Sequence, residues 1–232
     1  MTAYADLERA RLPERHIRGS SFRHRRLVLA NYVLFDPVEL ARPSMRPRET
    51  ALLGSLLKRA HHSLEFGAGG STTLALKLGV GRIVSVESDA SWIARIHGDG
   101  AASRAIEDGR LTLLHADIGP IGRMGGPGKE APRHKWPSYA QTPWAHIETA
   151  RLDLVLIDGR FRVACALQAA LRCASETAIV IHDFWNRPAY HGILPFFEEL
   201  GRCETMGVFR VRRDLDRQAA AALLEQAAYW PQ

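Results

Sequence analysis

The feature that most constrains the fold of this chain is a short apolar run that leads into a glycine-rich turn and then into a helix-like segment. The run is Ser63–Phe66, the turn is Gly67-Ala-Gly-Gly70, and the segment 71–78 is closed by Gly79. Glycine lets the backbone turn sharply and approach a ligand closely. The free N–H groups at the start of a helix point at the same place. This order predicts the first unit of an α/β fold, with a ligand at the turn.

Four further apolar runs follow, and helix-like stretches separate them. The runs are Arg82–Glu87, Leu111–Asp117, Leu152–Asp158 and Ala178–His182. The main helix-like stretches are Pro47–Ala60, Ala90–His97 after an Asp89 N-cap, and Val163–Cys173. Strands that alternate with helices predict a mostly parallel sheet with helices on both faces. After the stretch 191–200, we expect a closing strand pair within 204–213 around Gly207 and a terminal helix over Leu215–Tyr229.

Length and composition fit one domain with a terminal extension. The chain has 232 residues, of which 46% are hydrophobic and 24% are charged, as is typical of a globular protein. We expect the domain to occupy residues 45–232 and a helical or partly ordered extension to occupy 1–44. An apolar leader is missing, the three cysteines are too few for a disulfide framework, and no apolar run is long enough to cross a membrane. These features predict a cytoplasmic protein.

The extension carries the densest positive charge of a chain whose net charge is +6. Its arginines include Arg11, Arg15, Arg18, Arg23, Arg25 and Arg26, with Glu14 as the one acid among them. Clustered arginine attracts anionic partners. Because no recognised nucleic-acid module follows, a solvated extension is favoured over a nucleic-acid arm.

A long segment separates the third apolar run from the fourth. Residues 118–150 contain five glycines, five prolines and the aromatic residues Trp136, Tyr139 and Trp144. Loops of this length inside compact domains are usually functional or disordered. The aromatic residues favour a folded lid, and the alternative is a surface excursion pinned by its own tryptophans.

The acidic residue before the glycine turn makes the pattern more specific. Glu65 stands two residues before the first glycine, and Thr72 occupies the place of the third glycine of a dinucleotide fingerprint. The stretch Glu65-Phe-Gly-Ala-Gly-Gly70 resembles the first motif of the class I S-adenosylmethionine-dependent methyltransferases. The resemblance implies a Rossmann-like, seven-stranded, mostly parallel sheet with an antiparallel C-terminal strand pair. It also implies S-adenosyl-L-methionine as the cofactor, with Glu65 near its amino-acid end.

Later strand ends resemble further positions of that family. Glu87 matches the acid that accepts hydrogen bonds from both ribose hydroxyls, although dinucleotide enzymes also keep an acid there. Asp117 matches the acid that takes the adenine amino hydrogens, and Ile118 matches the residue that packs on the ring. Glu65 could instead be a strand-end carboxylate that caps nearby backbone N–H groups, and Asp117 could simply end its strand before Gly119-Pro120. The cofactor contacts that the resemblance implies are Glu65, Gly67, Ala68, Gly69, Ser71, Thr72, Glu87, Ser88, Asp117, Ile118 and Asp158.

Three titratable residues follow the fourth and fifth apolar runs. Asp158, His182 and Asp183 are predicted to meet where adjacent parallel strands end. A histidine with an ordinary pKa of about 6.5 suits a general base, and either aspartate could orient it. We therefore expect these three residues to be catalytic. The alternative is that His182 is a hydrogen-bonded wall residue.

A metal-assisted route is a second interpretation. Similarity to catechol-type and sugar O-methyltransferases implies that Asp158 and Asp183 could ligate a divalent ion such as Mg²⁺. His182 stands where that pattern usually has a carboxylate, and hard cations prefer oxygen. The metal site is therefore not a firm expectation.

Recognition of the acceptor is expected around the same strand ends. Arg160 and Arg162 are suited to bidentate contacts with an anionic group, or else they are solvent-facing charges. The stretch after the fifth run supplies Trp185, Asn186 and Tyr190 as further candidates for acceptor binding.

The sequence thus predicts an S-adenosylmethionine-dependent methyltransferase that O-methylates a small-molecule acceptor of the sugar or glycan type. A nucleic-acid methyltransferase is an alternative, although neither an Asn-Pro-Pro-Tyr-like motif nor a Lys-Asp-Lys-Glu set is visible. A protein that binds the cofactor without transferring the methyl group is another. The basic residues of 118–150 argue against an aminopropyltransferase, whose polyamine substrate is cationic. A homodimer stays open.

Overall fold

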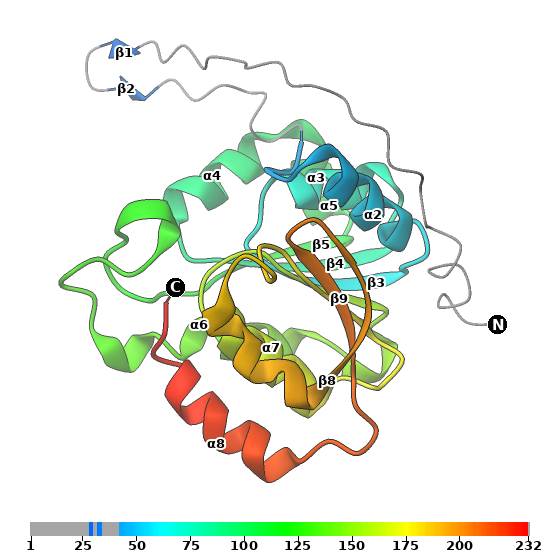
Figure 1. The fold of residues 1–232 in the computed structure, drawn as a ribbon. Coiled ribbons are helices and arrows are strands. Elements are labelled where there is room, and N and C mark those ends of the chain that lie inside the picture. Colours follow the sequence, from blue (N-terminus) through cyan, green and yellow to red (C-terminus); the bar gives the residue numbers. More distant parts are fainter. Residues whose placement is uncertain (1–27, 30–31, 34–41, 232) are drawn as a thin grey trace, which may run out of the picture.

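The computed structural model describes residues 28–29, 32–33 and 42–231. Within these residues a seven-stranded sheet with the order β5-β4-β3-β6-β7-β9-β8 forms the centre of the molecule (Figure 1). The strands are β3 (His62–Phe66), β4 (Arg82–Glu87), β5 (Leu111–His115), β6 (Leu154–Ile157), β7 (Ala178–Ile181), β8 (Phe197–Cys203) and β9 (Met206–Val211). Strand β9 runs antiparallel to both of its neighbours, and the other six strands share one direction. The predicted fold class is confirmed, and the five apolar runs form five of the six strands that share one direction.

Helices cover both faces of the sheet, as predicted. Figure 1 shows α2 (Pro47–Leu57), α3 (Gly70–Lys77), α4 (Ala90–Gly98) and α5 (Gly100–Glu107) above the sheet, and α6 (Ser138–Gln141), α7 (Arg162–Arg172) and α8 (Arg217–Ala227) below it. The expected N-cap is present, because the Asp89 carboxylate accepts a hydrogen bond from the backbone N–H of Ser91 at 2.9 Å. Helix α5 was not expected. Asp99 caps its start in the same way, through the N–H groups of Ala101 and Ala102.

Each central strand contributes to two cores, one on each face of the sheet. In β6, Leu154 and Leu156 pack with the side chains of α2 to α5, whereas Val155 and Ile157 pack with those of α7 and α8. Successive residues of a strand point to opposite faces. A strand that is buried on both faces therefore reads as an unbroken apolar run, which is the pattern the sequence shows.

The closing strand pair forms at a different place from the one predicted. Strands β8 and β9 meet at a tight turn through Glu204 and Thr205, where Glu204 adopts a left-handed φ of 52°. Gly207 lies inside β9 and not at a turn. A Cβ at Gly207 would stand 2.4 Å from the Phe209 ring, so glycine is needed there to admit the ring. The prediction around Gly207 was wrong because β8 is an edge strand whose exposed glutamates hide its strand character.

The segment 118–150 is folded onto the face that carries α7. It contains α6 and the 3₁₀ turns η1 (Arg123–Gly125), η2 (Arg133–Lys135), η3 (Thr142–His146) and η4 (Thr149–Arg151), and a further turn, η5 (Pro188–Phe196), precedes β8. Tyr139 is buried, with its ring centroid 6.2 Å from that of Phe66 and 5.7 Å from that of Phe161. Trp136 and Trp144 are partly buried against the same core. The aromatic residues therefore pin this segment, and a lid movement stays a prediction.

Most of the basic extension lies outside the described residues. In its described part, β1 (Val28–Leu29) pairs with β2 (Tyr32–Val33) in antiparallel fashion. Across the part of the chain that the structure describes, no helix has both the length and the apolar character needed to cross a membrane.

Candidate active site

The glycine turn after β3 packs directly on the loop after β6. Gly67 has a φ of +97°, and a Cβ on it would lie 2.7 Å from the backbone N and Cα of Gly159. On its other side, a Cβ on Gly159 would collide with the Tyr139 hydroxyl group. Glycine is therefore required at both positions, because two backbones and a tyrosine meet there. The turn is held rigidly at the carboxyl end of the sheet, where open α/β folds bind ligands.

Two residues that the sequence analysis did not name, Trp92 and Arg42, hold the rest of the turn. The indole N–H of Trp92, in α4, donates a hydrogen bond to the carbonyl oxygen of Ala68 at 2.6 Å. The backbone of Arg42 and Pro43 lies so close to Gly70 that a Cβ there would overlap the Arg42 carbonyl group. The chain that leads into α2 thus crosses the start of α3.

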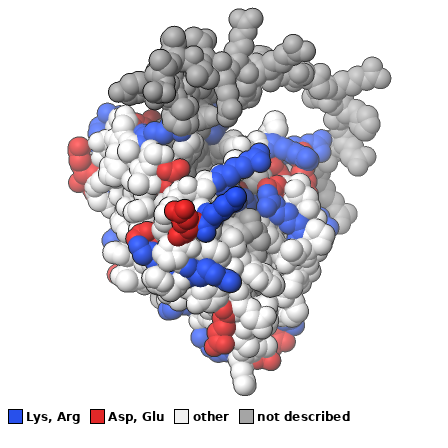
Figure 2. Space-filling view, turned by 90° about the vertical axis from the view of Figure 1, so that its left-hand side faces the viewer, with Lys and Arg blue, Asp and Glu red and all other residues white. Residues whose placement is uncertain are grey.

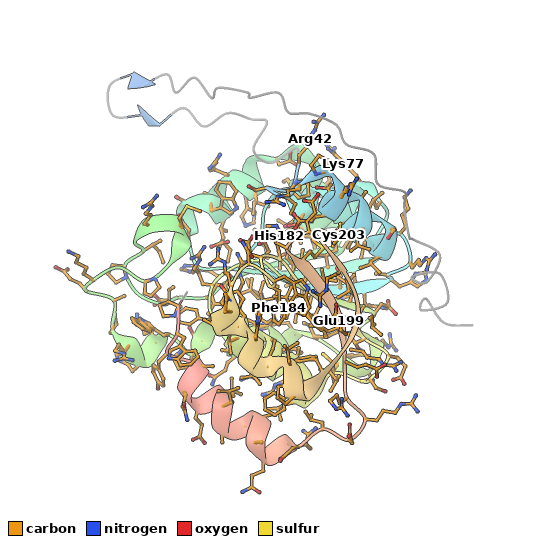
Figure 3. All side chains as sticks on the ribbon, viewed as in Figure 1. Arg42, Lys77, His182, Phe184, Glu199 and Cys203 are labelled. Atoms are coloured by element: carbon orange, nitrogen blue, oxygen red, sulfur yellow. The ribbon has the colours of Figure 1, made fainter. Side chains whose placement is uncertain are left out.

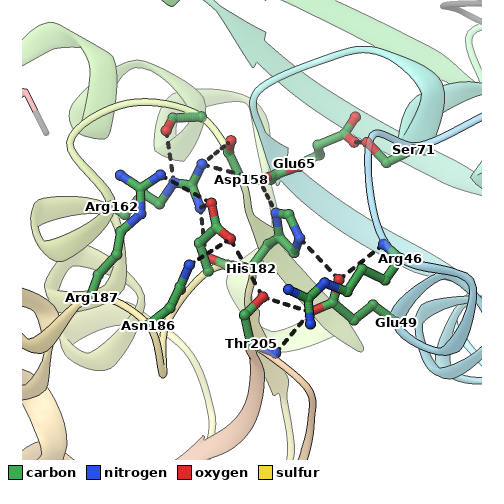
Figure 4. A network of polar contacts seen from close by, with 12 residues as sticks. Arg46, Glu49, Glu65, Ser71, Asp158, Arg162, His182, Asn186, Arg187 and Thr205 are labelled. Atoms are coloured by element: carbon green, nitrogen blue, oxygen red, sulfur yellow. Dashed lines mark hydrogen bonds and ion pairs between the residues drawn. The ribbon is translucent and has the colours of Figure 1, made fainter. Parts of the chain in front are cut away.

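Glu65 is buried behind the turn. Its carboxylate accepts hydrogen bonds from the hydroxyl groups of Ser71, of Thr72 at 2.5 Å and of Ser85 at 2.6 Å. Burial raises the pKa of Glu65 to about 7, although the three hydroxyl groups act in the opposite direction. The structure therefore brings the predicted cofactor residues Glu65, Ser71 and Thr72 together, with the hydroxyl groups bound to the carboxylate. Figure 4 shows Glu65 beside Ser71. Ser85, in β4, was not predicted.

Glu87 ends β4 with one carboxylate oxygen engaged. Its Oε1 atom accepts the backbone N–H groups of Ser88 at 2.7 Å and Asp89 at 2.9 Å. Burial raises the pKa of Glu87 against these hydrogen bonds. Among the described residues, the hydrogen bonds to this carboxylate all end on Oε1. The Ser88 hydroxyl donates to the carbonyl oxygen of Gly125 at 2.8 Å, so the turn η1 lies beside the predicted ribose position.

Asp117 and Ile118 face different surroundings. The Asp117 carboxylate is mostly exposed, and it accepts hydrogen bonds from Lys135 Nζ at 2.6 Å and from the backbone of Gly119 at 2.9 Å. The hydrogen bond from Lys135, followed by that from Gly119, lowers the pKa of Asp117. Ile118 is fully buried in the core next to it. In this structure the predicted adenine acid is thus bound to a lysine of the inserted segment.

His182 lies between two carboxylates at the end of β7. Its Nδ1 atom is 2.8 Å from Asp158 Oδ1, and its Nε2 atom is 3.3 Å from Glu49 Oε2. Burial by itself lowers the pKa of His182, but Asp158, Asp183 and Glu49 together raise it above its usual value. The predicted meeting of Asp158 with His182 is therefore present, with an additional acid on the other side of the ring (Figure 4).

Glu49 was missed by the sequence analysis. It lies in α2 with 1% of its surface exposed, and it accepts hydrogen bonds from the Thr205 backbone N–H at 2.9 Å and the Thr205 hydroxyl at 2.6 Å. Burial alone would raise the pKa of Glu49, but the hydrogen bonds from Thr205 and Arg46 and the charge of His182 lower it overall. No local pattern could have identified this acid, because its partners lie 133 and 156 residues further along the chain.

Arg162 is a buried clamp, so the alternative of a solvent-facing charge was wrong for this residue. Its guanidinium group donates hydrogen bonds to the carbonyl oxygens of His182 at 2.5 Å and Gly159 at 2.9 Å. It also lies 3.1 Å from Asp158 Oδ1 and 3.8 Å from Asp183 Oδ2. Arg162 therefore ties the ends of β6 and β7 together.

The donor set does not fit the magnesium ion that the second interpretation of the sequence left open. Asp158 is bound by His182 and Arg162, and Asp183 Oδ2 accepts a hydrogen bond from Arg187 at 3.0 Å. Asp158 Oδ1 and Asp183 Oδ2 are thus already engaged by cationic side chains. In the portion of the chain described by the structure, no group of three or more histidine, cysteine or acidic side chains is arranged to hold a metal ion.

Three of the four acceptor candidates, Arg160, Asn186 and Tyr190, interact with charged residues of the site, whereas Trp185 packs elsewhere. Arg160 is half-buried, and burial, followed by the neighbouring charge of Arg162, lowers its pKa. Asn186 donates to Asp183 at 3.3 Å, and Tyr190 is buried with its hydroxyl 3.2 Å from the guanidinium group of Arg187. Arg187 was not predicted.

Trp185 is separate from this group. It stacks edge-on against Phe184 at 4.9 Å and lies under the guanidinium group of Arg202 at 3.6 Å. Figure 3 shows Phe184 on the side of the sheet away from α2, whereas His182 lies toward α2. Trp185 therefore has a packing role in this structure.

Positive charge gathers on one face of the molecule. Figure 2 shows lysine and arginine side chains across the middle of this face, with a few acidic residues between them.

Two hollows of about 380 and 640 Å³ lie at the end of the sheet where the parallel strands begin, which is opposite the candidate active site. His62 and Arg151 line both hollows. Neither contains a predicted site residue.

Known structures resemble this chain, although no protein-family model matches it and a comparison with curated proteins finds no match. A methyltransferase-like protein from Silicibacter pomeroyi superposes with a TM-score of 0.71 and 28% sequence identity, over 82% of this chain and 100% of that one. The cofactor-bound protein Rv0187 from MTB superposes with a TM-score of 0.51 and 17% identity, over 76% of this chain and 85% of that one, and shows the fold alone. Together with the glycine turn after β3 and the strand order of the sheet, the first similarity shows that the chain has the Rossmann-like fold of the class I S-adenosylmethionine-dependent methyltransferases, which it resembles.

Proposed function

We propose that the protein uses S-adenosyl-L-methionine to methylate a hydroxyl group of a small, anionic acceptor of the sugar or glycan type. The observation that carries the proposal is the Asp158–His182 pair, which stands next to the rigid contact between Gly67 and Gly159. The proximity of the glycine turn to this pair supports a cofactor and a transfer site that lie side by side. Transfer between groups that are held in this way needs little further ordering.

The cofactor-binding residues in this proposal are those at the ends of the first strands. Glu87 Oε2 would accept hydrogen bonds from ribose hydroxyls, since the bonds to the protein are made by Oε1. The glycine turn would lie against the amino-acid end, with Glu65 holding the turn from behind. When bound, the cofactor supplies a methyl group on a positively charged sulfur atom, and the carboxylates at this edge of the sheet favour that charge.

We assign the contact with the acceptor hydroxyl to Asp158. Both His182 and Arg162 approach Oδ1 of this residue, which leaves Oδ2 to accept a hydrogen bond from the hydroxyl and then its proton. His182 suits this base role less well than the sequence predicted, because both of its ring nitrogens face carboxylates. The cationic side chains of Arg160 and Arg187 near the same strand ends support an anionic group on the acceptor.

Binding of the cofactor tests the first half of the proposal. Isothermal titration calorimetry should detect the binding of S-adenosylmethionine and of S-adenosylhomocysteine. Glu87→Ala should weaken the affinity for both compounds by roughly tenfold to a hundredfold, because hydrogen bonds to a charged group are lost. Glu107→Ala, which removes an exposed carboxylate from α5, is the matched control and should bind normally. Failure of the unmutated protein to bind either compound in several buffers would refute the proposal.

Transfer is tested with a labelled methyl donor and pairs of acceptors that differ only in an anionic group. The anionic member of a pair should be methylated more efficiently. Binding without transfer to any acceptor would favour the alternative of a non-catalytic binding protein. Methylation of nucleic acid in place of small acceptors would favour the other alternative.

A further inference from the structure

We propose that Glu49 is a positioning residue of the transfer site, which acts through His182 on Asp158. The inference deepens the function proposed above and rests on it. Glu49 lies in α2, on a segment that precedes the cofactor turn in sequence, and it is more than 100 residues away from both of the strands whose ends it serves. Its contacts make it part of the site.

Glu49 is held so firmly that it can define the position of another group. Its Oε1 atom accepts hydrogen bonds from the backbone and the hydroxyl of Thr205 at 2.9 and 2.6 Å. Its Oε2 atom accepts the backbone N–H of Arg46 at 3.0 Å and faces His182 Nε2 at 3.3 Å. A buried carboxylate with both oxygens engaged has little freedom to move, and its loss would leave buried donors unsatisfied.

The arrangement requires a charged imidazole ring. A neutral histidine can donate a hydrogen bond from only one of its two ring nitrogens, whereas the imidazolium form donates from both. His182 faces a carboxylate oxygen on each side, from Asp158 and from Glu49. Hydrogen bonds to both acids are therefore made together only when the ring is protonated. The raised pKa of His182 agrees with this geometry.

The other charged groups around the ring do not replace Glu49. Asp183 follows His182 in the chain and adds negative charge, but it is bound to Arg187 and lies near Arg162. Arg162, from α7, reaches the backbone carbonyl of His182 and not the ring. Of the four charged side chains around His182, which come from α2, the loop after β6, α7 and the loop after β7, Glu49 is the one placed to hold Nε2.

The effect on transfer comes from Asp158. A protonated ring that is fixed by Glu49 holds Asp158 Oδ1 through Nδ1, and this orients Oδ2 toward the acceptor. Without the carboxylate of Glu49, the ring becomes neutral at a lower pH and can turn or change tautomer. Asp158 then keeps Arg162 as its remaining charged partner but loses its second point of attachment.

The proposal is tested with Glu49→Gln, which keeps the size of the side chain and removes its charge. The titration of the His182 ring, followed by NMR and assigned with His182→Gln, should move to a lower pKa by about one unit or more, as expected when a close opposite charge is removed. The kcat should fall by roughly tenfold to a hundredfold, which is a part of the roughly 10²–10⁴-fold that general acid–base catalysis contributes. The KM for S-adenosylmethionine should change less than about threefold, and the alkaline limb of the kcat profile should move in parallel with the ring pKa. Glu49→Asp, which restores the charge, should recover part of both effects.

Glu204→Gln is the matched control. Glu204 belongs to the turn between β8 and β9 and pairs with Arg46 at 3.3 Å, so its loss perturbs the same contact between α2 and the turn without touching His182. It should leave the ring titration and kcat unchanged. If Glu49→Gln is too unstable to study, Thr205→Val loosens the same carboxylate and should shift both quantities in the same direction by a smaller amount.

The two proposals can fail separately. An unchanged His182 titration, or a kcat within about twofold of the unmutated value, in Glu49→Gln would overturn the role of Glu49. Equal losses in Glu49→Gln and Glu204→Gln would also overturn it, since they would show a purely structural effect. If the unmutated protein neither binds S-adenosylmethionine nor transfers methyl groups, the proposed function and the positioning role both fail, while the ring titration still decides whether Glu49 controls the charge of His182.

Discussion

At the scale of single residues, the carboxyl group of Glu65 combines deep burial with three hydroxyl partners. The hydroxyl groups of Ser71, Thr72 and Ser85 join α3 and β4 to the end of β3 through this one side chain. Burial outweighs these hydrogen bonds and raises its pKa to about 7. The group therefore titrates near neutral pH, well above an ordinary glutamate, and the stability of the protein should reflect this.

The first prediction concerns Glu65→Gln. Because the folded-state pKa lies above the unfolded value of about 4.5, the contribution of this group to stability is greatest below that value and is lost as the pH rises to about 7. The free energy of unfolding of the unmutated protein, relative to that of Glu65→Gln, should thus decrease between pH 5 and pH 8, by on the order of 3 kcal/mol at most. Urea denaturation at several pH values measures this. A difference between the two proteins that does not vary with pH would contradict the assignment, and Glu148→Gln, at an exposed ion pair with Arg151, is the control.

At the scale of elements, the unit formed by β3, its turn and α3 depends on the contact between two backbones. The φ of +97° at Gly67 would strain any other residue, and a Cβ at this position would also collide with the backbone of Gly159. Gly79, at the end of the same unit, has a φ of +81°, but no atom lies within 4 Å of the position that a Cβ would take there. Comparing substitutions at the two glycines therefore separates the cost of backbone strain from the cost of close packing.

We expect Gly67→Ala to lower the free energy of unfolding by more than Gly79→Ala does. The control substitution should cost about 1–2 kcal/mol, the usual cost of a left-handed backbone in a non-glycine residue. Gly67→Ala should cost that amount and about 1–3 kcal/mol more, because the added methyl group has to displace the backbone of the loop after β6. If urea denaturation gives equal losses in the free energy of unfolding for the two variants, the loop after β6 moves aside at no cost and the prediction is wrong. The same substitution should also weaken cofactor binding, as measured by calorimetry.

At the scale of the whole molecule, the contact between Glu49 and Thr205 joins the beginning of the domain to its end. Helix α2 precedes the sheet in sequence, and the turn between β8 and β9 closes it, yet the two are linked by a pair of hydrogen bonds across 156 positions. Such a link stabilises only the complete fold, because neither segment orders the other before the sheet has formed.

Thr205→Val tests this link by removing the hydroxyl group at nearly constant volume. We expect the free energy of unfolding to fall by about 1.5–3 kcal/mol, the usual contribution of a hydrogen bond to a charged group. Thr142→Val is the control, since its hydroxyl bonds to Ser138 within the same helical stretch, and should cost about 1 kcal/mol or less. Chemical denaturation followed by circular dichroism compares the two variants. If Thr142→Val loses more free energy of unfolding than Thr205→Val does, the long-range link is not the stronger contribution and the prediction is wrong.

Much of the fold follows from local patterns along the chain. Strands β3, β4 and β6 read as apolar runs because both of their faces are buried, and the glycine turn marks the junction of β3 with α3. Helix α5 was missed because its first turn, Gly100-Ala-Ala-Ser103, has no large apolar residue that would reveal a helical period. The β8–β9 turn was misplaced because exposed polar residues in β8 obscure its strand pattern, and a glycine inside β9 looked like a turn residue.

The sequence by itself determined the succession of most strands and helices along the chain, the glycine turn and the acids at successive strand ends. Each of these features depends on residues that are only a few positions apart. Only the tertiary structure decided how those acids are used. It bound Glu65 to three hydroxyl groups, paired Asp117 with Lys135 and enclosed His182 between Asp158 and Glu49. The protonation and orientation of a side chain depend on the charges and burial around it, and here those come from segments that are far apart in the chain.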